Sequence, residues 1–332
     1  MSTPARLAKI LIGIAVSVAL LAYLFWNVDL HEVVSRLAST NWWFLSVSIL
    51  LNLGSLWIRA WRWYYLFPPG SHPSHLFNAL MIGYLGNNVL PLRAGEVVRA
   101  YVASRRGQRF WTVLATIVVE RALDGLAVGV IVAILVLTIP LPQQLHWPAG
   151  IFLALDFGAM ITLAVLAVAP GWCSNVIHAF FHRWSWGERR AMDVLGTMSE
   201  GLRGVRAAHH FVPITLSTIL IWMLFALSVW TGLRAAHLDL PLAASWTVLA
   251  FLGLGVSLPS SPGYLGVVQA ATVLALALFS VPRTEALSFS LLIHASQFLP
   301  VTIYGLVLLL VEHVSLSEAT RTTGAPVASS QR

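Results

Sequence analysis

LGNNVLPLRAGEVVRA (residues 85–100) is the most informative stretch for the architecture, because LGVSLPSSPGYLGVVQA (254–270) repeats its pattern about half a chain later. Each copy runs from Leu-Gly through Leu-Pro and a glycine-bearing turn to Val-Val, a polar residue and Ala. The spans before the two copies are expected to end on opposite membrane faces, which is typical of an inverted-topology repeat. The sequence therefore predicts two re-entrant or broken hairpins, within repeat halves 42–140 and 211–312. The alternative is chance likeness, since Leu, Pro and Gly recur in any apolar, glycine-rich chain.

The composition places these hairpins in a membrane. Of the 332 residues, 58% are hydrophobic and 10% are charged, whereas about 25% of a soluble domain is charged. A soluble enzyme and a disordered chain are therefore excluded. The apolar runs are continuous and reach about 20 residues, which predicts helices rather than a β-barrel. We expect an all-α polytopic integral membrane protein, one transmembrane domain over 1–332, with about eight membrane segments, near 9–26, 42–58, 75–90, 111–139, 149–169, 211–233, 243–281 and 285–311.

The arginines predict the orientation. If the stretch 75–90 dips in and returns, 16 of the 20 basic residues fall on the cytoplasmic side, as the positive-inside bias requires. We therefore expect a cytoplasmic (inner) membrane protein with both termini in the cytoplasm. Arg59 and Arg62 are interpreted as interfacial residues within an aromatic belt. The basic stretch 171–210 is expected to be a cytoplasmic loop that fixes topology, with anionic lipid binding as the alternative, and 315–332 to be a mobile tail.

Arg93, Glu96 and Arg99 form the first candidate site. Two guanidiniums and one carboxylate within seven residues leave a positive site that suits a phosphate. In a helix, Glu96 lies one turn from either arginine and is expected to pair with one of them. The alternative is a plain interfacial cluster that sets topology.

Glu120, Arg121 and Asp124 form the second candidate site, about ten residues into a span. Glu120 and Asp124 share a helix face, and Arg121 meets Asp124 one turn away. Charges at that depth are costly unless they are paired or face water. We expect a phosphate-binding arginine with its acids, or a proton relay; the alternative is a structural ion-pair network.

Neutral polar residues near the hairpins complete the candidate set. Asn87 and Asn88 are expected to cap or cross-link the first hairpin, with capping favoured and headgroup contact as the alternative. The others are expected to offer hydrogen bonds from the second hairpin and the last span, although a lone buried histidine is more often a packing residue. These are Ser261, Tyr264, Gln269, His294 and Gln297.

Three motifs carry a resemblance to a known family. N-N-x-L-P-x-R-x-G-E-x-x-R (87–99), E-R-x-x-D (120–124) and P-G-Y-L-G (262–266) resemble the flippase-like family that shares its transmembrane region with lysylphosphatidylglycerol synthases. The resemblance covers most of the chain and implies about eight helices and movement of lipids or lipid-linked sugars between leaflets. Gln269 departs from it, since relatives tend to carry glutamate there. Lysyl transfer is not expected, because no aminoacyl-transfer domain is recognised. The residues that match are Asn87, Asn88, Pro91, Arg93, Gly95, Glu96, Arg99, Glu120, Arg121 and Asp124.

Three functional hypotheses follow. The first is a carrier, not an enzyme, that passes a phospholipid or a polyprenyl-phosphate lipid across the membrane without cofactor, metal or nucleic acid. The second is a membrane-embedded glycosyltransferase that uses Asp29 and Glu32 in its first outer loop. The third is a non-transporting partner of lipid-synthesis or glycosylation enzymes that docks through 171–210. Neither a P-loop nor a Gly-x-Ser-x-Gly motif is present, so ATP-driven transport by this chain alone is not expected.

Overall fold

The computed structural model describes residues 15–312, with gaps at 16, 27, 91–93, 182–183 and 257–260 and across most of 139–168. The described residues form helices and connecting turns, with no strand among them. The all-α expectation is confirmed for this part of the chain. The predicted tail 315–332 and most of the predicted span 149–169 lie outside the described residues.

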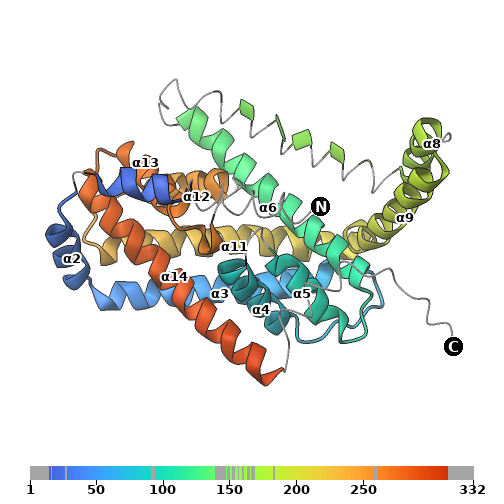
Figure 1. Ribbon diagram of the computed structural model, residues 1–332, viewed down its shortest axis with the longest axis horizontal. Coiled ribbons are helices and arrows are strands. Elements are labelled where there is room, and N and C mark those ends of the chain that lie inside the picture. Colours follow the sequence, from blue (N-terminus) through green and yellow to red (C-terminus); the bar gives the residue numbers. More distant parts are fainter. Residues whose placement is uncertain are drawn as a thin grey trace.

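The helices follow one order twice (Figure 1). A long helix is followed by two short helices and a second long helix. The first series is α3 (Trp42–Leu66), α4 (Leu76–Val89), α5 (Gly95–Ser104) and α6 (Phe110–Thr138). The second is α11 (Ala208–Ala235), α12 (Leu242–Val256), the short 3-10 turn η2 (Pro262–Tyr264) with α13 (Val267–Ala277), and α14 (Arg283–Val311). Before them stands α2 (Leu30–Ala38), and between them stand α8 (Pro170–Phe181), α9 (Ser185–Gly201) and α10 (Arg203–Arg206).

Four described helices are long and apolar enough to cross a membrane: α3, α6, α11 and α14. A fifth span results if the helix Ser17–Phe25 and α2, which meet at 92°, count as one broken span. The expected eight segments are therefore not reached. The reason is length, because α4, α5, α12 and α13 have 14, 10, 15 and 11 residues, and a crossing helix needs about 20.

Helices α3 and α11 form the spine of the bundle and run antiparallel. The backbone N–H of Asn41 donates to the carbonyl of Ala235 at one end of the pair. In the middle, Ser48 Oγ donates to the carbonyl of Ser228 at 2.7 Å, and Ser228 Oγ donates back to the carbonyl of Ser48 at 2.8 Å. Small side chains let the two backbones approach closely, as is common between membrane helices.

Helices α4 and α5 form the first hairpin, which packs backbone against backbone. Gly83 lies against Arg99, and Gly86 lies against Gly95, so the two helices are antiparallel. A Cβ atom on Gly95 would lie 2.0 Å from the carbonyl oxygen of Gly83. Helices α12 and α13 form the second hairpin, in which Gly255 faces Val267.

The tips of the two hairpins meet beside α14. A Cβ atom on Gly263, in the turn of the second hairpin, would lie 3.5 Å from the carbonyl oxygen of Asn88 at the first. Successive turns of α14 contact both tips. Phe298 packs on Gly263, and Thr302 accepts a 2.8 Å hydrogen bond from Asn88 Nδ2. Gly305 then lies against Met81. These contacts bring the two hairpins together at their tips.

The end of α14 is fixed to the first hairpin by Glu312. Its two carboxylate oxygens accept hydrogen bonds from Asn78 Nδ2 at 2.7 Å and from Arg106 Nη2 at 2.8 Å. Burial raises the pKa of Glu312, but these two hydrogen bonds outweigh it and hold that pKa below its ordinary value. The carboxylate is therefore charged at neutral pH, and the contact between α14, α4 and the end of α5 is an ionic one.

Stretch 171–210 is not the plain loop that the sequence predicts. It contains α8, α9 and α10, with α9 packed on α6 and α10 packed on α3 and α11. Gly204 of α10 lies against the backbone of Leu66, and its carbonyl oxygen lies 3.0 Å from Nδ1 of His210. A Cβ atom on Gly204 would lie 2.3 Å from the carbonyl oxygen of Leu66, so the glycine allows α10 to pack this closely on α3.

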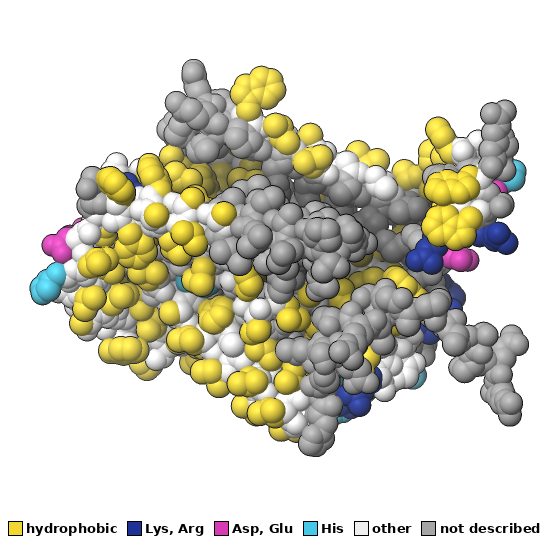
Figure 2. Space-filling view, in the orientation of Figure 1, with side chains coloured by type: hydrophobic (Ala, Val, Ile, Leu, Met, Phe, Trp, Pro, Cys, Tyr) yellow, Lys and Arg dark blue, Asp and Glu magenta, His cyan; other side chains and the backbone are white. Residues whose placement is uncertain are grey.

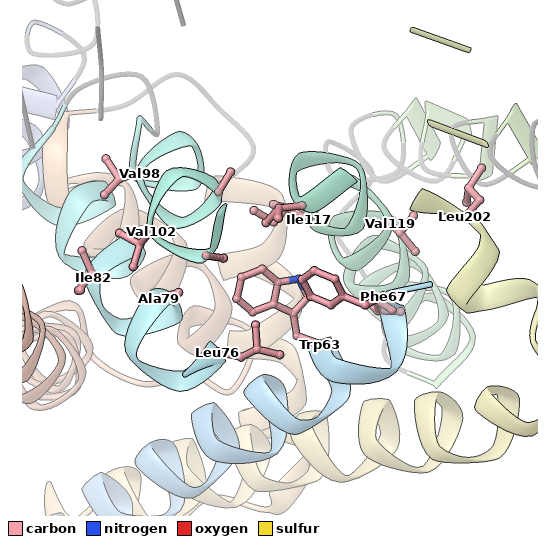
Figure 3. Packing of buried hydrophobic residues seen from close by; sticks show 14 of the residues in the cluster. Trp63, Phe67, Leu76, Ala79, Ile82, Val98, Val102, Ile117, Val119 and Leu202 are labelled. Carbon is pink, nitrogen blue, oxygen red and sulfur yellow. The ribbon is translucent and has the colours of Figure 1, made fainter. Parts of the chain in front are cut away.

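On the described part of the face shown in Figure 2, hydrophobic side chains predominate among the coloured ones, and the charged side chains lie mostly toward its ends. Beneath the surface, Trp63 of α3 is fully buried at the centre of a core built with α4, α5 and α6 (Figure 3). Its indole N–H donates to Thr116 Oγ1 at 2.9 Å. The core beneath this face is thus itself largely hydrophobic.

Candidate functional site

Seven charged side chains gather between α3, α5 and α6, and we call them the arginine–carboxylate cluster. Helix α3 brings two arginines, α5 brings one arginine and one acid, and α6 brings an arginine and two acids. All are held by rigid helices rather than by loops. The members are Arg59, Arg62, Glu96, Arg99, Glu120, Arg121 and Asp124.

Glu120 is the inner acid of the cluster, and its side chain is 0% exposed. Arg99 donates to both of its carboxylate oxygens, from Nη2 at 2.6 Å and from Nη1 at 3.1 Å. Arg59 Nη1 donates to it at 3.2 Å. Cζ of Arg99 lies 3.6 Å from the centroid of the Trp63 ring, so this guanidinium is stacked as well as paired.

Asp124 lies one helical turn further along α6 and binds the arginines of α3. Arg62 Nη2 donates to Oδ1 at 2.7 Å, and Arg59 Nη1 donates to Oδ2. Arg62 also donates from Nη1 to Thr218 of α11 at 3.1 Å, which ties the cluster to the second series of helices. Glu120 and Asp124 share one face of α6, as the sequence predicts, because both accept from Arg59.

Arg121 and Glu96 form the accessible edge of the cluster. Arg121 Nε lies 2.8 Å from Glu96 Oε1, and their side chains are 37% and 25% exposed. The predicted contact between Arg121 and Asp124 is present at 4.0 Å. The expectation that Glu96 pairs with Arg93 or Arg99 is wrong for Arg99, which points to Glu120 instead. Arg93 lies outside the described residues.

The cluster carries a net positive charge, because its four guanidiniums face three carboxylates. Glu120 follows the first residue of α6 by ten residues, which is about 15 Å along the helix. The hydrocarbon core is about 30 Å thick, so this depth is near its middle if α6 enters the hydrocarbon at its first residue. An unbalanced charge at that depth costs about 2.5–3.5 kcal/mol or more. An anion bound beside the cluster would remove this cost.

The cluster also has unused hydrogen-bond donors. Within the part of the chain that the structure describes, the buried Nε–H groups of Arg59, Arg62 and Arg99 have no hydrogen-bond partner. A guanidinium presents its donors in a planar fork that suits phosphate oxygens. These three groups are therefore donors of the type that bind oxyanions.

The second-hairpin candidates form a separate group around Gln269. Gln269 is buried, and its side chain lies between the backbone N–H of Gly266 and the ring of His294. Ser261 donates from Oγ to the carbonyl of Leu265 at 3.3 Å. Tyr264 is half-buried in the same turn, with a left-handed φ of 58°. Gln297 lies one turn beyond His294 and is half-buried.

The two asparagines have different surroundings. Asn88 donates from Nδ2 to Thr302, so it links the first hairpin to α14. Asn87 is buried next to Gly95, and its Oδ1 accepts no hydrogen bond from a described residue. A linking role at the hairpin is therefore supported for Asn88, and contact of either residue with a headgroup stays a prediction.

Sequence reasoning missed the two arginines of α3. Arg59 and Arg62 were expected at an interface, but their side chains are 5% and 0% exposed and lie in the cluster. A signal for this is present in the sequence. Counting back from Arg62 and Arg59 in steps of three and four residues gives a stripe of polar positions, occupied by Ser55, Asn52 and Ser48. That spacing marks one helix face that is buried against a partner.

Comparison with known proteins gives the family. The model of the lysylphosphatidylglycerol synthase TM region matches residues 10–305. The chain belongs to this family. It is a multi-pass membrane protein, as the sequence predicts, and its motif resemblance is confirmed.

Two relatives are similar over most of this chain. Glycosyltransferase AglD of Haloferax volcanii is 25% identical over 352 aligned positions, which cover 95% of this chain and 56% of AglD. The chain thus spans little more than half the length of that relative. A UPF0104 membrane protein of Methanothermobacter thermautotrophicus is 22% identical over 305 positions, covering 86% of this chain and 88% of the relative. No solved structure matches the chain significantly. Within the described ranges, no three His, Cys, Asp or Glu side chains form a group that could hold a metal ion.

Proposed function

We propose that the protein is a carrier that moves a phosphate-bearing lipid, a phospholipid or a polyprenyl phosphate, between membrane leaflets. The observation that carries the proposal is the net positive, mostly buried arginine–carboxylate cluster, about halfway along α6 and with unused guanidinium donors. A buried charge excess at that depth is stabilised by an anion, and the anion available within a bilayer is a lipid phosphate. The acyl or prenyl tails would stay in the hydrocarbon.

The twofold order of helices supports alternating access. We interpret α3–α6 and α11–α14 as inverted repeats, because their helices match in order and nearly in length and α3 runs antiparallel to α11. Such repeats bind substrate near the midplane between broken helices and expose it to each side in turn. The hairpin tips that meet beside α14 would be the moving parts.

For the orientation, we propose the inner membrane with both termini in the cytoplasm. The proposal rests on the arginines outside the helix core. Arg59, Arg62 and Arg99 no longer count toward it, since they are buried in the cluster. The remaining cytoplasmic excess, including the arginines of 171–210, still favours this orientation.

A headgroup would enter at Arg121 and Glu96, which form the accessible edge of the cluster. A phosphate competes with the Glu96 carboxylate for Arg121, because both are oxyanions that bind the same donors. Once bound at Arg121, the phosphate would lie one helical turn from the inner carboxylates, which repel it and so favour its release.

Arg121→Gln tests the carrier, and we expect it to slow leaflet exchange of anionic lipid at least tenfold. The substitution neutralises the cluster and removes its accessible donor, while the buried pairs of Glu120 stay intact. Exchange is measured in proteoliposomes with phosphatidylglycerol, a polyprenyl phosphate and the zwitterionic phosphatidylethanolamine. Arg234→Gln is the matched control, because Arg234 is 38% exposed and paired with Asp239 away from the cluster.

The exchange assay can support or exclude the carrier proposal. Loss in Arg121→Gln with normal exchange in Arg234→Gln supports the carrier, and the lipid that is moved names its headgroup. If folded wild-type protein moves none of the three lipids, the carrier proposal fails.

A second candidate is a membrane-embedded glycosyltransferase, which the name of the relative AglD favours. The sequence offers Asp29 and Glu32 for it. In the structure, Asp29 caps α2 by accepting from the N–H of His31 at 2.8 Å, and Glu32 pairs with Arg36 at 2.9 Å. Asp29→Asn is expected to leave lipid exchange within about twofold of wild type. A loss of sugar transfer from a lipid-linked donor in this variant would favour the transferase instead.

A further inference from the structure

Gln269 holds the turn of the second hairpin through two hydrogen bonds, one that it accepts and one that it donates. Its Oε1 accepts from the backbone N–H of Gly266 at 2.8 Å. Its Nε2 lies 2.9 Å from Nδ1 of His294. The backbone N–H is only a donor, so it fixes the orientation of the amide, and the amide N–H then donates to the imidazole. Nδ1 is therefore unprotonated, and His294 is the neutral form with its proton on Nε2.

Among the described residues, no charged side chain acts on His294. It is half-buried in α14, with its ring against Phe298 and with the backbone of Gly263 within hydrogen-bonding reach. None of the titratable groups on the packed elements acts on it electrostatically. These are His31, Glu32 and Arg36 on α2; Arg59, Arg62, Tyr64 and Tyr65 on α3; Tyr84 on α4; His209, His210 and Arg234 on α11; Tyr264 in η2; and Arg283, Glu285 and Tyr304 on α14 itself. Helix α13 has none.

We propose that His294 is a proton-binding site that releases the turn of the second hairpin when it is occupied. A proton on Nδ1 turns that atom into a donor, and it would then face the donating amide of Gln269. The amide must rotate so that Oε1 accepts from His294. Rotation leaves the Gln269 amide N–H against the N–H of Gly266, which loses its only acceptor. The hydrogen bonds of Gln269 to Gly266 and to His294 therefore cannot both persist when His294 is protonated.

The lost bond matters because of where Gly266 lies. Gly266 starts α13 with φ 84° and ψ −48°, a conformation that other residues rarely adopt. The same turn holds Gly263, which lies against Asn88 at the tip of the first hairpin. Freeing the start of α13 would loosen the contact between the two tips. This site needs no bound lipid, so it can exist whether or not the carrier proposal holds.

The experiment is hydrogen–deuterium exchange with mass spectrometry on the full chain in nanodiscs, at pH 5 and pH 8. The range brackets the ordinary imidazole pKa of about 6.5. Labelling times are scaled for the intrinsic pH dependence of exchange. In wild type, the peptide covering 261–269 is expected to exchange about tenfold faster at pH 5 than at pH 8, because one buried hydrogen bond is lost.

Two variants and a control separate the proton site from general acid effects. His294→Gln accepts from Gln269 but binds no proton, so the pH difference is expected to vanish. Gln269→Glu only accepts, and it can hold Gly266 and a protonated His294 at once, so acid is expected to leave the turn closed. His237→Gln removes an exposed histidine beyond α11 and is expected to keep the wild-type difference.

The hydrogen–deuterium exchange results test the proton site without any transport measurement. Equal corrected exchange at both pH values in wild type would overturn the proposal. So would a pH difference that persists in His294→Gln, or in Gln269→Glu where His294→Gln does not fold. Failure of lipid exchange with an intact pH difference would remove the carrier and leave the proton site.

Discussion

Glu120→Gln is expected to destabilise the folded protein by about 3–5 kcal/mol. Glu120 is fully buried and holds Arg99 by two hydrogen bonds and Arg59 by one. Its removal leaves Arg99 without an anion and raises the net charge of the cluster by one unit. An amide oxygen accepts one of these bonds but neutralises neither guanidinium, so the desolvation cost of the arginines is no longer offset.

Reversible unfolding in mixed micelles measures this effect. Glu32→Gln is the matched control, because Glu32 also pairs with an arginine but its side chain is 43% exposed. Exposed pairs contribute about 0–1 kcal/mol, so the two variants are expected to differ several-fold. Arg99→Gln in the Glu120→Gln background is expected to recover part of the loss, since both members of the pair are then neutral. A loss below 1 kcal/mol for Glu120→Gln would show that the inner pair does not hold the helices together.

Gly95→Ala is expected to destabilise the first hairpin by about 2–3 kcal/mol or more. The added Cβ would lie 2.0 Å from the carbonyl oxygen of Gly83 and 2.3 Å from the backbone N of Asn87. Both obstacles are backbone atoms of α4, which cannot rotate away as a side chain would. The helices must separate, and α5 then carries Glu96 and Arg99 away from their partners on α6.

Gly54→Ala is the control for this prediction. Gly54 lies in α3, where a Cβ would meet nothing within 4 Å. The substitution is expected to be neutral or to stabilise by up to about 1 kcal/mol, through helix propensity. Both variants are compared by unfolding and by leaflet exchange. Equal stability of the two variants would contradict the close approach of α4 and α5.

Much of the architecture could be predicted because it depends on the composition and order of residues along the chain. The apolar runs predicted membrane helices, and the structure has four that are long enough. Glycine and proline predicted that stretches 75–100 and 243–281 are interrupted, and each forms a hairpin of short helices. The number of spans was overestimated, since hydropathy does not distinguish a helix that crosses from one that turns back.

The site was predicted in part. Glu120 and Asp124 were placed on one face because i,i+4 spacing is a local property of a helix. Their partners were not, because Arg59 precedes Glu120 by 61 positions and no local pattern pairs residues so far apart. An arginine beside tryptophans at the end of an apolar run suits an interface equally well.

Hydropathy, helix breakers and motif spacing are local properties of the chain, and they were enough to predict a helical membrane protein of a known family, with two interrupted hairpins and acids within a span. The packing of the helices was needed to show which arginine neutralises which acid and that the cluster keeps a positive excess. It was also needed to show that Gln269 faces His294. Such pairings depend on how α3, α5, α6, α13 and α14 pack, because ion pairs and hydrogen bonds form between atoms within about 3 Å, whatever their separation in sequence.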